Sequence, residues 1–236
     1  MHAAFFREAL DAVHANGGAP RILVSGAADY SMLAYVIAVF GARETAPDVT
    51  VVDRCETPLA LNRWYAELAG LRLATSHGDI RQYANASGFD AICTHSLLGR
   101  FSPEERPALF QKWHELLRPG GTVVTVNAVR PGHTTPMVRF TADEVRAFRA
   151  KVHRSAEDLR DTLQMDPLVL AEAAERYASQ HRIYPVRSEE ELRFGRRLAA
   201  DGRRPDLLRA LTRASRRRSR LDQVVDPVFR PSPRSG

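Results

Sequence analysis

Cysteine is scarce in this chain of 236 residues, in which Cys55 and Cys93 are the only two. Two cysteines without a CxxC spacing exclude a disulfide-rich secreted fold and the common zinc motifs. We therefore expect a reducing, cytoplasmic environment and no metal site.

Long apolar runs are also absent. No run approaches the roughly 18–20 apolar residues that a membrane-spanning helix needs. The first apolar segment contains Glu8 and Asp11, so we expect no secretory signal. Because 44% of the residues are hydrophobic, the chain can still bury a sizeable core. Its length suits one α/β domain with an elaboration.

An excess of basic charge is missing from the body of the chain. Residues 1–186 carry 20 Lys and Arg against 21 Asp and Glu, whereas residues 187–236 carry 14 Arg against 7 acidic residues. The body therefore gives no electrostatic reason to expect nucleic acid as a partner. We predict that the Arg- and Pro-rich residues 201–236 are poorly ordered, because only 223–229 resembles a strand and Pro227 interrupts it. Three interpretations stay open: a solvated tail, a surface for RNA or acidic membranes, and a degenerate end of the reading frame.

Short apolar, β-branched runs alternate with segments of helical spacing over residues 21–130. The runs that we predict to be strands are 22–25, 49–53, 71–75, 89–94 and 122–126. Strands separated by helices at this spacing imply βαβ crossovers. We therefore predict an α/β fold, a doubly wound, Rossmann-like and mostly parallel sheet with helices on both faces. Residues 1–20 add an N-terminal helix.

The alternation stops near Thr141, which forms a predicted capping box with Glu144. From there to residue 180 the pattern is helical, with an interruption at Asp166 and Pro167. Residues 131–200 are thus predicted to be a helical insert after the fifth strand, followed by a return to the core. Two interpretations are equally open, a packed helical hairpin and a lid over a substrate pocket.

Polar residues follow several of the predicted strands. Gly26 follows the first strand, Asp53 ends the second, and Asp79 comes just after the third. Ligands of open parallel sheets bind beyond the carboxyl ends of the strands. Asp53 can accept hydrogen bonds from both hydroxyls of a ribose, or it caps the next helix. Asp79 can accept from an adenine amine, with Ile80 against the ring, or it is a turn residue.

Residues 21–127 resemble the core of the class I S-adenosylmethionine-dependent methyltransferases. The segments that carry the resemblance are 21–26, 51–53, 78–80, 89–106 and 116–122. The resemblance implies a Rossmann-like fold, S-adenosyl-L-methionine as the cofactor and methyl transfer as the reaction. It implies a cofactor site formed by Ser25, Gly26, Ala27, Asp29, Tyr30, Asp53, Arg54, Asp79, Ile80, Thr94 and His95.

The first motif departs from the family pattern. Val24 stands where the family has an acidic residue, and Ala28 and Tyr30 stand where it has glycines. Tyr30 thereby puts a bulky side chain where the backbone would approach the methionine end of the cofactor. Asp29 could bind the cofactor's ammonium group, or cap the helix that begins near Ser31.

Methyl transfer is an in-line displacement, so orientation and deprotonation of the acceptor carry most of the rate. His95, just past the fourth strand, is the candidate base, or else a histidine held by hydrogen bonds in its loop. Candidates for the acceptor pocket are His133, Tyr177, His181 and Tyr184. The absence of an Asn-Pro-Pro-Tyr-like sequence argues against methylation of amino groups on nucleic acid bases.

We therefore predict a methyltransferase that acts on a small molecule. Two alternatives stay open. One is a non-catalytic protein that keeps the fold and binds a nucleotide or a partner, and the other is an RNA methyltransferase that uses the Arg-rich C-terminus as a tether. A dehydrogenase is disfavoured because residues 26–31 make a poor dinucleotide fingerprint.

Overall fold

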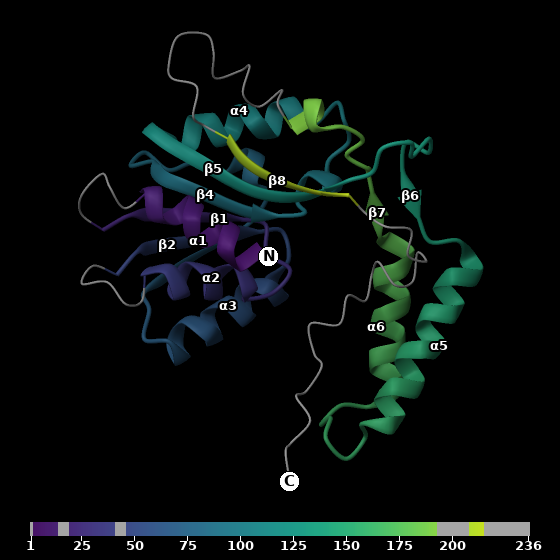
Figure 1. Cartoon of the computed structure of the whole chain (residues 1–236). Coiled ribbons are helices and arrows are strands. Elements are labelled where there is room, and N and C mark those ends of the chain that lie inside the picture. Colours follow the sequence, from purple (N-terminus) through teal and green to yellow (C-terminus); the bar gives the residue numbers. More distant parts are fainter. Residues whose placement is uncertain (1, 14–18, 41–45, 193–207, 215–236) are drawn as a thin grey trace. The chain divides into compact units, whose positions relative to one another are not determined.

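The computed structural model describes residues 2–13, 19–40, 46–192 and 208–214, which fall into two compact units (Figure 1). The first unit contains the described residues up to Thr134 and those from Tyr184 onward, and the second contains Thr135–Ile183. The Arg- and Pro-rich C-terminus predicted for residues 201–236 lies outside the described residues, except for 208–214. None of the described helices is both long enough and apolar enough to cross a membrane.

The first unit is built on a six-stranded sheet with the order β3-β2-β1-β4-β5-β8. Every pair of neighbouring strands in it is parallel. The strands are β1 (Arg21–Ser25), β2 (Asp48–Asp53), β3 (Leu73–His77), β4 (Phe89–His95), β5 (Leu117–Val129) and β8 (Leu208–Ala214). Because β1 lies in the middle, between β2 and β4, the chain reverses direction across the sheet at this point. The predicted Rossmann-like α/β class is confirmed.

Helices cover both faces of this sheet (Figure 1). On one face α1 (His2–Val13), α2 (Ser31–Phe40) and α3 (Glu56–Leu68) contribute to a core that includes Phe6, Phe40 and Leu59. On the other face, α4 (Arg106–Leu116) contributes to a second core with Phe89, Leu109 and Trp113. Two apolar layers on one sheet explain why β1 is almost continuously apolar, since a strand buried on both faces cannot alternate.

The strand β8 corrects the prediction for the C-terminal segment. It lies along β5, with Leu208 opposite Val123 and Ala214 opposite Val129. The sequence analysis found strand character only at 223–229, which lies outside the described residues. It missed β8 because the segment LRALTRA contains no run of β-branched residues, and because the pairing partner, β5, is distant in the chain.

The strand β5 begins before the predicted run 122–126 and contains an irregularity. Leu117 pairs with Phe89, but the next paired residue is Thr122, opposite Ala91. The residues between them bulge away from β4, with Gly120 at a φ of 83°. A Cβ on Gly121 would lie 2.9 Å from the carbonyl oxygen of Phe89, so glycine is required there for close approach of the backbone.

The helix α4 begins at Arg106, and its N-cap residue Glu105 makes no side-chain cap. The side chain of Glu105 instead accepts a hydrogen bond from the backbone N–H of Ser102 at 2.9 Å. The carbonyl of Ser102 accepts from the N–H groups of Glu105 and Arg106, so a turn precedes the helix.

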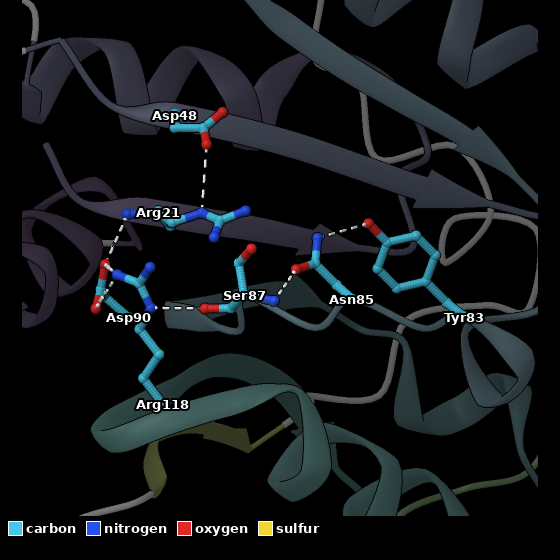
Figure 2. A network of polar contacts seen from close by, with 7 residues as sticks. All are labelled: Arg21, Asp48, Tyr83, Asn85, Ser87, Asp90 and Arg118. Atoms are coloured by element: carbon cyan, nitrogen blue, oxygen red, sulfur yellow. Dashed lines mark hydrogen bonds and ion pairs between the residues drawn. The ribbon is translucent and has the colours of Figure 1, made fainter.

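A polar network around Asp90 connects the amino ends of neighbouring strands to one another (Figure 2). Its carboxylate accepts from the backbone N–H of Arg21 at 2.8 Å and lies 3.2 Å from Arg118 Nη1. Arg21 also pairs with Asp48 at 3.3 Å, and Arg118 Nε donates to the carbonyl of Ser87 at 2.8 Å. β1, β2, β4 and β5 are therefore joined at this edge, and the opposite, carboxyl edge is where a ligand is expected.

The second unit is a helical hairpin with a small two-stranded sheet. Its elements are β6 (Val138–Arg139), α5 (Ala142–Asp158), α6 (Pro167–Gln180) and β7 (Arg182–Ile183). The predicted capping box between Thr141 and Glu144 is confirmed, and Asp166 caps α6 by accepting from Leu168 N–H. Phe148, Ala174 and Ala178 form its core.

Candidate functional site

Backbone hydrogen bonds join the carboxyl ends of β1, β2 and β3 to one another and that of β4 to β5. The N–H of Gly26 donates to Val52, that of Gly78 to Asp53, and that of Ser96 to Val126, at 2.7–2.9 Å. The residues that follow β1, β2, β3 and β4 therefore meet at one edge, as the sequence predicted. This edge includes the place where the strand order reverses, which is where open α/β sheets bind ligands.

Asp53 connects the ends of β1 and β2. One carboxylate oxygen accepts from the N–H of Ala27 at 2.8 Å and the other from the N–H of Cys55 at 2.7 Å. Each carboxylate oxygen has two acceptor sites, so each keeps one for a further donor. Asp53 is half-buried and therefore fixed but accessible. Neighbouring Arg54 is exposed, and its carbonyl oxygen lies 3.0 Å from His77 Nε2.

Gly26 makes the turn after β1 in a conformation that favours glycine, with a φ of 72°. A Cβ at this position would lie 2.6 Å from Leu97 Cδ1, because the side chain of Leu97 rests against the turn. The loop after β4 is thus packed directly on the turn after β1. Leu97 was not predicted as a site residue, and no signal in the sequence distinguishes it from a core leucine.

The position of Tyr30 in the first motif suggested a side chain at the methionine end of the cofactor, but the structure places its ring against α3. Its ring stacks on Tyr65 at a centroid distance of 4.7 Å and meets Trp64 edge-on at 5.7 Å, both on α3. Asp29 caps α2, because it accepts from the N–H of Ser31 at 2.7 Å. Its carbonyl accepts from the buried side chain of Asn62 at 3.1 Å. The bulky side chain of Tyr30 in the first motif therefore packs on α3.

Asp79 is engaged by Arg81. Both of its oxygens accept from the guanidinium of Arg81, at 2.7–3.2 Å, and one also accepts from the Arg81 N–H at 2.9 Å. The hydrogen bonds from Arg81 hold the pKa of Asp79 below its ordinary value. Arg81 also donates to Glu105 at 2.8 Å and lies over the Phe101 ring. Ile80 is buried in the core beside α4.

Two polar side chains near the sheet edge lie in the core. The hydroxyl of Ser25 accepts from Trp113 Nε1 at 3.0 Å, and both residues are buried. The hydroxyl of Thr94 is also buried, but it has no hydrogen-bond partner among the described residues. His95, next to Thr94, is exposed, and Ser96 adopts a φ of 56°. The backbone thus turns sharply directly after the candidate base.

Arg106 holds the segment that returns to the core through an ion pair and hydrogen bonds. It was not predicted as a functional residue from the sequence. Its guanidinium is buried, forms an ion pair with Glu191, and donates to the carbonyls of Leu98 at 3.3 Å and Tyr184 at 2.8 Å. Burial lowers the pKa of Arg106, and Glu191 opposes that shift. The N–H of Tyr184 donates to the carbonyl of Gly99 at 2.8 Å. Tyr184 is thereby fixed beside the loop that follows β4.

The four candidates for the acceptor pocket divide between the two units. In the second unit, Tyr177 and His181 lie 5.0 Å apart between ring centroids, within an aromatic group that also contains Phe140 and Phe148. In the first unit, half-buried His133 follows β5, where its N–H donates to the carbonyl of Arg130 at 3.3 Å. Because Tyr177 and His181 lie in one unit and His133 and Tyr184 in the other, a pocket shared by all four residues stays a prediction.

Comparison with known proteins bears on this arrangement. Residues 36–121 match a family model described as "Methyltransferase domain". Over these residues the chain resembles a methyltransferase domain. The match agrees with the resemblance of the motifs to the class I S-adenosylmethionine-dependent methyltransferases. No curated protein sequence matches the chain.

Solved structures are also similar to this chain. A protein of Bordetella parapertussis, described as a possible exported protein, is 15% identical with a TM-score of 0.52, over 87% of this chain and 64% of that one. CalS10, an amino pentose methyltransferase of Micromonospora echinaspora, is 26% identical over 52% of this chain and 48% of its own, with a TM-score of 0.41. A methyltransferase of Clostridium acetobutylicum is 14% identical over 51% and 47%, with a TM-score of 0.42. This chain spans about half the length of the last two.

Proposed function

We propose that this methyltransferase transfers the methyl group of S-adenosylmethionine to a small molecule at the carboxyl edge of its sheet. The observation that supports it most is the set of hydrogen bonds around the Asp53 carboxylate. Two backbone N–H groups orient its carboxylate, and both oxygens keep an acceptor site. Two hydroxyls on adjacent carbons of a ribose match that pair of acceptors.

The first turn fits the same cofactor. A side chain on Gly26 would press against Leu97 and would need a φ of 72°, so this turn favours glycine. The N-terminus of α2 follows directly, and its dipole favours a carboxylate such as that of the methionine moiety. The buried hydroxyl of Thr94, which lacks a partner among the described residues, offers a further hydrogen bond.

The adenine end is assigned to the segment from Asp79 to Arg81. Three N–H groups of Arg81 donate to the Asp79 carboxylate, and the Nε–H is shared between its two oxygens. An adenine amine would therefore have to compete with Arg81 for this carboxylate, or bind to backbone atoms of the same turn. For this reason we assign more of the binding free energy to Asp53 than to Asp79.

The cofactor, when bound, supplies an electrophilic methyl group, and the acceptor attacks it in line. The remaining work of the protein is to orient the acceptor and remove its proton. His95 is the proposed base, because it lies exposed at the end of β4, beside the strand end that carries Gly26. His133 and Tyr184, both in the first unit, are proposed to line the acceptor pocket.

Calorimetric titration tests the proposal at its first step. We expect S-adenosylmethionine and S-adenosylhomocysteine to bind at a ratio of one per chain. The variant His95→Ala should keep this binding and lose methyl transfer, by about 100-fold for a general base. The absence of binding at millimolar cofactor would refute the proposed function, and binding without any effect of His95→Ala on turnover would refute only the role of the base.

A further inference from the structure

Arg130 lies at the carboxyl edge of the sheet, directly after β5. Its N–H donates to the carbonyl of Val186 at 2.8 Å, and its carbonyl accepts from the N–H of His133 at 3.3 Å. Val129, the last residue of β5, forms a parallel bridge with Val186. These contacts hold the backbone of Arg130 on both sides. The strand that carries it is the one beside β4, where His95 pairs with Val126.

The side chain of Arg130 is half-buried, and no described residue compensates its charge. Burial lowers the pKa of Arg130, and no neighbouring charge contributes to the shift. No carboxylate pairs with it in the described ranges 2–13, 19–40, 46–192 and 208–214. Partial removal of a guanidinium from water is unfavourable unless an anion replaces the lost hydration.

Other arginines that are at least half-buried differ from Arg130 in this respect. They are paired as follows: Arg21 with Asp48, Arg81 with Asp79 and Glu105, and Arg106 with Glu191. A structural role for Arg130 would call for a similar partner. The unmatched arginine is instead the one at the edge of the sheet where the methyl acceptor is proposed to bind.

We propose that Arg130 binds a carboxylate of the methyl acceptor, so that the substrates of this enzyme are small carboxylic acids. This inference rests on the proposed function for the location of the acceptor. A guanidinium presents a planar pair of N–H donors that matches the two oxygens of a carboxylate, and such pairs are stronger than neutral hydrogen bonds. A carboxylate bound there would supply the negative charge that the described residues do not place beside Arg130.

The test compares acids with the amides in which an uncharged group replaces the carboxylate. The protein, with and without saturating S-adenosylhomocysteine, is titrated at constant ionic strength with glycine, benzoate and 4-hydroxybenzoate, with the matching amides and with inorganic phosphate, while the melting temperature is followed. We expect at least one acid to stabilise the protein saturably where its amide does not. Arg130→Met should weaken that effect at least 10-fold, and Arg130→Lys should retain part of it.

Arg72→Met is the matched control, because Arg72 is exposed and precedes β3 at the opposite edge of the sheet. It removes the same charge and should leave the effect of the acid unchanged. Equal effects of acids and amides, a loss in Arg72→Met equal to that in Arg130→Met, or stronger binding of phosphate than of every acid would overturn the inference. Failure of S-adenosylhomocysteine to bind, with acid binding still dependent on Arg130, would refute the proposed function and leave the carboxylate site standing.

Discussion

Arg106 and Glu191, 85 residues apart in the chain, form an ion pair beside the loop that follows β4. Arg106→Met would remove the ion-pair partner of Glu191, which keeps the N–H of Arg187 as a donor, and the donor to the carbonyls of Leu98 and Tyr184. Removing one member of a buried ion pair costs about 3–5 kcal/mol. Because Glu191 is only partly buried, we expect the free energy of unfolding, measured in urea, to fall by an amount at the lower end of this range.

The exposed pair of Arg63 with Glu56 provides the control for Arg106. Arg63→Met should cost less than about 1 kcal/mol, because exposed ion pairs contribute little. Equal losses in the two variants would show that Arg106 does not have the structural role assigned to it.

The contact between Gly26 and Leu97 gives a second prediction. Gly26→Ala forces an alanine into a φ of 72° and pushes against the Leu97 side chain, whereas Gly70→Ala meets a φ of 63° with nothing within 4 Å. Both should lose about 1–2 kcal/mol of stability through the backbone conformation. Only Gly26→Ala should also weaken binding of S-adenosylhomocysteine, as measured by calorimetry. If both variants bind it as the wild type does, the β1 turn does not contact the cofactor.

Tyr30 is predicted to matter for stability and not for the cofactor. Its ring packs on Tyr65 and Trp64, and an aromatic pair contributes about 0.5–1.5 kcal/mol beyond burial. Tyr30→Ala should therefore lower the free energy of unfolding by at least that amount, while Tyr30→Phe should keep it. Neither should change the affinity for S-adenosylhomocysteine by more than about twofold. A large effect of Tyr30→Phe on that affinity would place the hydroxyl in the cofactor site.

The order of elements was predictable because it depends on local patterns. Apolar β-branched runs identified β1, β2 and β4, and the spacing of Thr141 and Glu144 identified the start of α5. The strand ends were therefore placed correctly around Gly26 and Asp53. Local patterns also carried the resemblance on which the family assignment was based.

Contacts between distant segments were not predictable. β8 depends on pairing with β5, and the partner of Arg106 lies in the return segment near Tyr184. The ring of Tyr30 is drawn toward α3 by residues that its own motif does not include. In each case the deciding partner is far away in sequence, and a single sequence carries no signal of the pairing.

The pair of Asp79 and Arg81 predicts a dependence of stability on pH. Because the pKa of Asp79 is lowered in the folded state, its contribution is present above its ordinary value near 3.8 and is lost as the pH falls through the folded pKa. Unfolding in urea at pH 6 and at pH 3 should show a smaller loss of stability in Asp79→Asn than in the wild type. An identical loss in both would mean that the Asp79–Arg81 pair does not contribute to acid sensitivity.

The most direct test of the cofactor site is the affinity of Asp53 variants for S-adenosylhomocysteine. We expect calorimetry to show binding weakened about 10–100-fold in Asp53→Ala, since charge-assisted hydrogen bonds contribute about 1.5–3 kcal/mol. Asp53→Asn should fall between this variant and the wild type. Asp48, at the other end of β2, provides the control, and Asp48→Ala should bind as the wild type does. An unchanged affinity in Asp53→Ala would contradict the account.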